Sequence, residues 1–320
     1  MAGGGRRFRF GVVGESIRSA EQVVAEAGRA EDLGYSTLLL RDHFQREPFG
    51  DQLAPLVALT AAARATSMLR VGTLVLDNDY RHPVLLAQEA ATLDVLSGGR
   101  FELGIGAGWL REEYDRAGLP FDPAAVRVGR LEESVQVLKR LFAGDAVTFS
   151  GTHYTVTDME TFPRPAQRPH PPILVGAGSR RMLGIAGREA DIVGILPKAL
   201  PNGTISQELS ERSPETMAQK IEWVREAAGD RFPDLELSTI VSVVVAEDHH
   251  AAAERLAARR GWAGLPAERV LDLPSMVAGE PDRIAEQLHA RRERYGLSYF
   301  VVSDQDMAGF SPVVQRLSGG

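Results

Sequence analysis

The sequence predicts an α/β protein folded as a (β/α)8 TIM barrel with insertions. Short runs of β-branched residues and leucine alternate with longer segments whose apolar side chains recur at helical spacing. This alternation continues from about residue 8 to residue 302, and 320 residues are enough for one barrel. We therefore interpret residues 1–320 as a single domain.

Eight strands and eight helices are expected in order along the chain. The first helical segment, residues 19–34, ends at Gly34, a residue type that commonly terminates helices. The expected strands are Phe8–Val13, Tyr35–Arg41, Leu69–Leu76, Phe101–Ile105, Ile173–Val175, Asp191–Leu196, Leu237–Val245 and Ser298–Val302. The expected helices cover residues 19–34, 53–66, 84–96, 124–143, 179–188, 214–228, 248–260 and 281–295.

Two segments interrupt the alternation. Val147–Thr157, with Ser150-Gly151 at its turn, predicts a β-hairpin insertion. Residues 197–213 are rich in Pro, Gly, Asn and Ser and predict a lid-like insertion. An open, doubly wound sheet is the alternative architecture. It is disfavoured because Gly104-Ile-Gly-Ala-Gly108 follows a fourth strand and lacks the glycine spacing of dinucleotide-binding folds.

Composition excludes several classes of function. A net charge of -7 gives no general attraction to nucleic acid or anionic lipid, and no apolar run is long enough to span a membrane. Residues 1–9 lack the apolar stretch of a secretory signal, so we expect a cytoplasmic protein. The chain has no cysteine, so redox chemistry requires a bound organic cofactor. We expect a small-molecule substrate, and neither nucleic acid nor a membrane as partner.

The active site of a β/α barrel lies at the C-terminal ends of its strands, so the residues that follow each strand are candidates. Asp42 and His43 follow the second strand, where a carboxylate and an imidazole can position a proton donor beside a cofactor ring. Their alternative role is to hold a neighbouring loop. The other candidates at strand ends are Glu15, Ser16, Asp77, Asn78, Tyr80, Gly106, Gly108 and Trp109.

A glycine-rich turn follows the fifth strand. Gly176-Ala177-Gly178 leads into Ser179 and Arg180 at the start of a helix, where exposed N–H groups favour a phosphate. The alternative is an ordinary tight turn in which Ser179 caps the helix. Trp109 could wall a flat ring or serve only in packing. His249-His250 has no carboxylates in a ligand pattern nearby, so we expect no metal site.

Further motifs resemble those of the luciferase-like monooxygenase superfamily. They are Arg81-His-Pro, Leu93-Asp-Val-Leu-Ser-Gly-Gly-Arg100, Gly104-Ile-Gly-Ala-Gly-Trp109, Glu113-Tyr114, Gly151, Pro163, Pro165, His170-Pro-Pro172 and Ala190-Asp191. The resemblance covers nearly the whole chain, and the combined spacing is highly specific. It implies a flavin or deazaflavin at the barrel mouth, and a homodimer, the common state of the relatives.

Within this superfamily, Asp42-His43-Phe44-Gln45 resembles the second strand end of actinobacterial enzymes that use coenzyme F420, including the glucose-6-phosphate dehydrogenase type. In those relatives the aspartate and histidine lie beside the deazaflavin ring, and the histidine takes part in proton transfer. The resemblance implies the same roles for Asp42 and His43. It also implies a cis peptide bond at Leu74–Val75 behind the ring, and a cofactor phosphate at Gly178, Ser179 and Arg180.

Two departures argue against sugar-phosphate oxidation. Trp109 stands where the sugar-phosphate dehydrogenases have a glutamate after the glycines of strand four. Their active-site tryptophan, which follows the Asp-His pair closely, is missing from Phe44–Gly50. Trp109 and Tyr80 instead favour a more apolar or planar substrate.

The leading hypothesis is a coenzyme F420-dependent oxidoreductase that transfers a hydride between deazaflavin C5 and a small organic substrate. The reaction is either reduction of an activated double bond or oxidation of an alcohol. We take His43, Asp42 and Glu15 as catalytic candidates and Trp109 and Tyr80 as substrate contacts. The cofactor contacts would be Asp42, Leu74, Val75, Asn78, Gly106, Gly108, Ala177, Gly178, Ser179 and Arg180.

Two alternatives remain. The first is a monooxygenase that takes reduced FMN from a separate reductase and activates oxygen, with the same fold and phosphate site. The second is a barrel that has lost its chemistry and acts only as a binding protein. The Asp42-His43 pair and the Gly-Ser-Arg turn argue against the second alternative.

Overall fold

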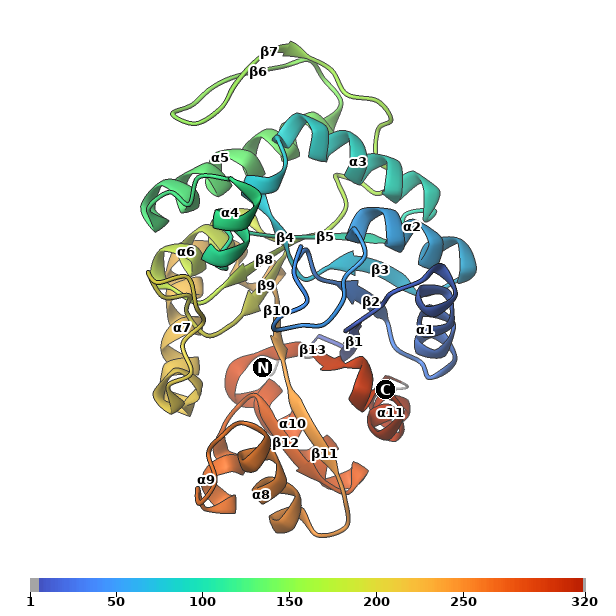
Figure 1. Cartoon of the computed structure of the whole chain (residues 1–320), viewed down its shortest axis with the longest axis vertical. Helices are drawn as coiled ribbons and strands as arrows, with labels where there is room; N and C mark the ends of the chain where they lie inside the picture. The colour runs from blue at the N-terminus through green and yellow to red at the C-terminus, as the bar shows by residue number, and fades with distance from the viewer. Residues whose placement is uncertain (1–5, 319–320) are drawn as a thin grey trace.

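The computed structural model describes residues 6–318 and contains a closed barrel of parallel strands surrounded by helices (Figure 1). The neighbour order is β3-β2-β1-β13-β10-β9-β8-β5, and β5 pairs with β3 to close the ring, while β4 continues the line of β3 beside β5. This confirms the predicted (β/α)8 TIM barrel. The barrel strands are β1 (Arg9–Val13), β2 (Thr37–Leu40), β3 (Arg70–Thr73), β4 (Leu76–Asp77), β5 (Phe101–Gly106), β8 (Ile173–Ala177), β9 (Ile192–Ile195), β10 (Glu236–Ile240) and β13 (Leu297–Ser303).

Helices cover the outside of the barrel. Several begin at residues suited to a first turn: Ser19 caps α1, Ser213 with Pro214 starts α7, and Pro83 starts α3. Gly34 lies just beyond α1 with φ of +83°, as expected from the sequence. The covering helices are α1 (Ala20–Asp32), α2 (Pro55–Ala65), α3 (Pro83–Leu96), α5 (Ala124–Ala143), α6 (Arg180–Glu189), α7 (Pro214–Ala228), α10 (Pro281–Tyr295) and α11 (Asp304–Ser318).

Two expected strands are each divided in the structure. The segment Leu69–Leu76 is broken between β3 and β4, where the Leu74–Val75 peptide bond is cis. The prediction of one strand at Leu237–Val245 is wrong. The structure has two strands there: β10 belongs to the barrel, whereas β11 (Ser242–Val245) leaves it and pairs with β12 (Met276–Gly279). The sequence suggested one strand because apolar residues on both sides of the break are buried: Val241 and Val243 pack in the main core, and Val244 packs in the core of the small sheet.

The small sheet of β11 and β12 packs against α8 (His249–Arg259) and α9 (Ala267–Asp272), below the barrel in Figure 1. Four elements were not predicted from the sequence: α4 (Arg111–Ala117), α9, β12 and α11. The first predicted insertion is a β-hairpin, in which β6 (Val147–Ser150) pairs with β7 (Thr155–Met159) in antiparallel fashion. The second, residues 197–213, includes the short 3₁₀ helix η2 (Leu209–Arg212). Within residues 6–318, no helix has the length and apolar character needed to cross a bilayer.

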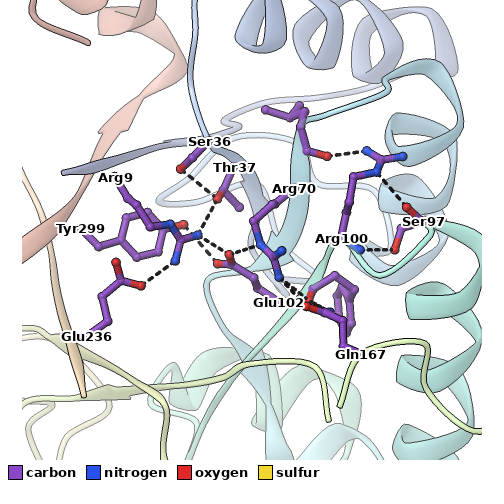
Figure 2. A network of polar contacts seen from close by, with 12 residues as sticks. Arg9, Ser36, Thr37, Arg70, Ser97, Arg100, Glu102, Gln167, Glu236 and Tyr299 are labelled. Atoms are coloured by element: carbon purple, nitrogen blue, oxygen red, sulfur yellow. Dashed lines mark hydrogen bonds and ion pairs between the residues drawn. The ribbon is translucent and has the colours of Figure 1, made fainter. Parts of the chain in front are cut away.

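Charged residues close the N-terminal end of the barrel (Figure 2). Glu102 is buried and accepts hydrogen bonds from Arg9 and from Arg70, whose Nε lies 2.5 Å away. Arg9 also pairs with Glu236 at 2.5 Å, and its guanidinium lies over the Tyr299 ring. Above this network, apolar side chains fill the interior: Val13, Leu39, Leu74, Leu174, Ile192, Tyr299 and Val301. Both features leave the opposite end of the barrel as the place for a cavity.

Candidate active site

A cavity of about 970 Å³ lies at the C-terminal ends of the strands, where barrel enzymes place their active sites. Its lining comes from the residues after β2, the β3–β4 bulge, β5, β8, β9 and β10, and residues of the 197–213 insertion also line it. The sequence-predicted residues in the lining are Asp42, His43, Leu74, Val75, Asp77, Gly106, Gly108, Trp109, Ala177, Gly178 and Ser179.

His43 is held by a carboxylate that the sequence analysis did not single out as a site residue. Its Nδ1 lies 3.0 Å from Oε2 of Glu113, a buried residue of α4. Burial alone would raise the pKa of Glu113, but its hydrogen bonds with His43 and with the backbone N–H groups of Gln45 and Phe44 lower the pKa below its ordinary value. Glu113 is therefore ionised at neutral pH.

Aromatic side chains confine the His43 ring. The Phe49 ring centroid lies 4.8 Å away with an interplanar angle of 30°, and Trp109 meets His43 edge-on at 5.9 Å. The Arg41 guanidinium covers the Phe49 ring at 4.3 Å. This arrangement restricts the orientations that the imidazole can take and gives the cavity an apolar wall.

Asp42 lies in the cavity lining but is already paired. Its two oxygens accept hydrogen bonds from the two terminal nitrogens of Arg81, at 2.5 and 3.0 Å, and Oδ2 also accepts from the Asp77 N–H. Through these partners the Asp42 carboxylate joins the end of β2 to β4. Its geometry favours positioning of the strand ends.

The bulge between β3 and β4 forms the floor of the cavity. Its Leu74–Val75 bond is cis, as the resemblance implied. The Val75 side chain packs toward β5, where a Cβ placed on Gly106 would lie 2.8 Å from Val75 Cγ2. Gly106 therefore has a steric role, since it lets the bulge approach β5 and present a smooth apolar surface.

The glycine turn after β8 brings Gly178 and Ser179 to the cavity but directs Arg180 away. A Cβ on Gly178 would lie 2.5 Å from the Pro197 carbonyl oxygen, so only glycine allows the two loops to meet so closely. Ser179 caps α6 through the Met182 N–H. The Arg180 side chain is exposed and lies 3.6 Å from Glu226 on α7. As the structure stands, its guanidinium does not contribute to the cavity.

Cationic side chains line the other end of the cavity. Buried Lys220 donates to Glu211 at 2.9 Å and to the Leu196 carbonyl at 2.8 Å. Arg212 and Arg260 also line the cavity, and within residues 6–318 neither makes an ion pair. Burial and the charge of Arg260 lower the pKa of Arg212. Two guanidinium groups without a carboxylate partner are suited to an anionic ligand.

Asp77 is a third buried carboxylate in the cavity lining, beside Asp42 and Glu113. Both oxygens of Asp77 accept hydrogen bonds from the Tyr114 hydroxyl, at 2.9 and 2.8 Å, and Oδ1 also accepts from the Asp79 N–H. Burial, together with the charges of Asp79 and Asp42, raises the pKa of Asp77 to about 7, although its hydrogen bonds oppose this shift.

Four further candidates lie outside the lining, and the first, Ser16, accepts a hydrogen bond from Arg18. Glu15 pairs with Arg41 at 2.9 Å, and Asn78 is buried and donates to the Tyr154 hydroxyl at 3.3 Å. Tyr80 donates to Oε2 of Glu113 at 3.1 Å. Sequence reasoning gave no role to Glu113, Lys220, Arg212 or Arg260. Only Glu113 carried a signal, its place in the Glu113-Tyr114 motif.

Comparison with known proteins agrees with this geometry. The family model described as luciferase-like monooxygenase matches residues 7–299. The chain is 32% identical over 302 residues to a protein of Microbacterium testaceum named F420-dependent glucose-6-phosphate dehydrogenase, covering 92% of this chain and 84% of that relative.

Solved structures of similar fold include a coenzyme F420-dependent tetrahydromethanopterin reductase from Methanopyrus kandleri. The TM-score is 0.77 at 19% identity, with 98% of this chain and 99% of that chain covered. An F420-dependent secondary alcohol dehydrogenase gives a TM-score of 0.75 at 18% identity, with 98% of each chain covered. The barrel with its strand-end cavity, the family match over residues 7–299 and the relative at 32% identity together establish that the chain belongs to the luciferase-like monooxygenase family.

Proposed function

We propose that the protein is an oxidoreductase that uses coenzyme F420 to exchange a hydride with a small organic substrate. The relative at 32% identity is named for dependence on this cofactor. The observation that carries the proposal is the placement of His43, which lines the cavity while Glu113 holds its Nδ1. The reaction is reduction of an activated double bond or oxidation of an alcohol.

The residues present fit a flat, largely apolar ring with an anionic tail. The floor is apolar at Leu74 and Val75, Gly106 adds no side chain, and the volume of about 970 Å³ accommodates a cofactor together with a substrate. Gly178 and Ser179, at the start of α6, would hold the phosphate of the tail through backbone N–H groups. Arg180 would reach that phosphate only after leaving Glu226.

Bound at this place, the deazaflavin would supply the hydride acceptor or donor, and the side chains would orient the reactants and handle the proton. His43 would exchange the proton with the substrate, and Asp42 would fix the end of β2 beside the ring. Trp109 would limit the substrate on the side of His43. Glu15 and Tyr80 would act through Arg41 and Glu113, respectively.

The cationic end of the cavity limits the class of ligand. Lys220, Arg212 and Arg260 would attract an anionic group on the substrate or on the cofactor tail. The name of the relative specifies a sugar phosphate. The substrate of this chain is proposed only as a small organic molecule, because Trp109 favours a more apolar or planar reacting end.

A binding comparison tests the cofactor. Reduced F420 and reduced FMN would be titrated into the purified protein under anaerobic conditions, with binding followed by fluorescence. Selective binding of F420 is the expected result. Selective, tight binding of FMN together with oxygen-dependent product formation would favour the monooxygenase alternative.

A His43→Ala variant that binds F420 normally should lose about 10²–10⁴-fold in turnover. Full turnover would remove the proton-transfer role.

Homodimer formation and supply of reduced cofactor by a separate reductase belong to the same proposal. Val57 on α2 and Leu85 on α3 are exposed apolar residues on helices that pack side by side. An exposed apolar face of this kind supports self-association. Sedimentation equilibrium of the purified protein should give twice the chain mass, and a value equal to one chain would reject the dimer.

A further inference from the structure

We propose that Glu113 is a positioning residue that fixes the neutral imidazole of His43 in the Nδ1–H tautomer and leaves Nε2 as the ring nitrogen that receives or returns the proton. The consequence for turnover rests on the proposed function. The tautomer itself is a property of the free protein, so it can be tested without cofactor or substrate.

Four hydrogen-bonding groups surround the Glu113 carboxylate. Oε1 accepts from the backbone N–H groups of Phe44 at 2.5 Å and Gln45 at 3.1 Å. Oε2 receives the Tyr80 hydroxyl at 3.1 Å and faces His43 Nδ1 at 3.0 Å. An ionised carboxylate has about four lone-pair positions, and here four groups occupy them. No position is left for a proton, which excludes Glu113 itself as the general acid.

These contacts decide which ring nitrogen of His43 carries the hydrogen. A carboxylate that cannot carry a proton only accepts hydrogen bonds, so Nδ1 must be the donor at 3.0 Å. A neutral imidazole has one N–H, and Nε2 therefore keeps a lone pair. Within residues 6–318, Nε2 makes no hydrogen bond, although His43 lines the cavity. The nitrogen left for a ligand in the cavity is therefore Nε2.

Neighbouring side chains hold the His43 ring in place against Glu113. Phe49 lies close against the His43 ring and Trp109 meets it edge-on, which opposes rotation of the imidazole away from Glu113. Glu113 also holds the backbone that follows His43, through Phe44 and Gln45. One buried carboxylate thus fixes both the loop after β2 and the protonation pattern of the ring.

A glutamine at position 113 gives a sharp test. The two backbone N–H groups of Phe44 and Gln45 require an acceptor, so the amide oxygen of Glu113→Gln would take the place of Oε1 and the NH₂ group would face His43. Nδ1 would then become the acceptor and Nε2 would carry the hydrogen. Glu113→Gln should invert the neutral tautomer without a large change in shape.

Long-range ¹H–¹⁵N correlation spectra of the labelled protein at about pH 8 distinguish the two tautomers. His43 is assigned by the signal that His43→Gln removes from the spectrum of the seven histidines. Wild type should show Nδ1–H, and Glu113→Gln should show Nε2–H. Glu112→Gln, on the exposed face of the same helix, and Tyr80→Phe should both keep Nδ1–H. An Nε2–H tautomer in wild type, or an unchanged tautomer in Glu113→Gln, would overturn the proposal.

Kinetics separate this inference from the proposed function. With F420 and a substrate, Glu113→Gln should lower kcat by about 10²–10⁴-fold with little change in KM, because a general base in the wrong tautomer cannot take the proton. If the variant does not fold, the wild-type tautomer alone still decides the inference. Absence of F420 binding or turnover in wild type contradicts the proposed function and leaves the tautomer result standing.

Discussion

Asp42 and Arg81 form a two-point ion pair, with Nη1 to Oδ2 at 2.5 Å and Nη2 to Oδ1 at 3.0 Å. The pair joins the end of β2 to the segment after β4, because Arg81 follows the 3₁₀ helix η1 (Asn78–Tyr80). Asp42 also accepts from the Asp77 backbone. A residue that sequence patterns favour as catalytic is therefore part of the framework beside His43.

Arg81→Lys tests this framework role. A lysine has a single charged centre and cannot reproduce two parallel hydrogen bonds, so the free energy of unfolding should fall by about 1–3 kcal/mol. The measurement is denaturation by urea at neutral pH. Arg111→Lys is the matched control, because Arg111 makes an exposed one-point pair with Asp115 and should change stability by less than about 0.5 kcal/mol. Equal losses in the two variants would contradict the assignment.

Asp77 should make stability depend on pH between about 4 and 7. Because burial raises the pKa of Asp77 in the folded state to about 7, its stabilising contribution is complete at low pH and is lost as pH rises toward 7. The loss is on the order of 2–4 kcal/mol. In Asp77→Asn this part of the pH dependence should disappear, while Asp115→Asn, at an exposed position, should keep it. Urea denaturation at several pH values gives the comparison, and identical profiles for wild type and Asp77→Asn would refute it.

Glu102→Gln should destabilise the barrel without affecting the cavity. The substitution removes the carboxylate shared by Arg9 and Arg70, and breaking such a partly buried pair costs about 2–4 kcal/mol. Affinity for F420 should stay within about twofold, because the network closes the opposite end of the barrel. Thermal and urea unfolding measure the first effect and fluorescence titration the second. A strong loss of cofactor affinity in a folded Glu102→Gln protein would show that the two ends are coupled.

The cationic end should bind simple anions. Inorganic phosphate is expected to raise the Tm of wild type, and the double variant Arg212→Gln, Arg260→Gln should lose most of that increase. Arg225→Gln is the control, because Arg225 is an exposed residue of α7 near Glu222. A phosphate effect that is the same in all three proteins would place anion binding elsewhere.

The barrel could be predicted from the sequence because its signals are local. Each buried strand is a short apolar run and each helix has its own periodicity, so the order of elements follows without knowledge of contacts. The division between Ile240 and Ser242 could not be predicted, since Val241 and Val243 are both buried in the main core and only Val244 packs in the core of the small sheet. The missed helix α11 had a usable signal in the spacing of Met307, Phe310, Val313 and Val314, all of which are buried.

Some site residues could also be predicted from the sequence, and others could not. His43 could be found because it follows a strand, and strand ends in a barrel converge on one mouth. Its partner Glu113 is 70 positions away and belongs to a seven-residue helix that the sequence analysis did not predict. Arg212 and Arg260 come from the insertion and from the end of α8, and only the folded chain brings them to one cavity. Arg180 shows the opposite case, since a residue in the expected turn directs its side chain away.

A crystal structure of the protein with coenzyme F420 would show whether the cofactor occupies this cavity. We expect the deazaflavin ring over the Leu74–Val75 bulge, with His43 Nε2 facing the reacting edge and the phosphate near Gly178 and Ser179. A cofactor bound outside this cavity, or a ring separated from His43 by the Trp109 wall, would contradict it.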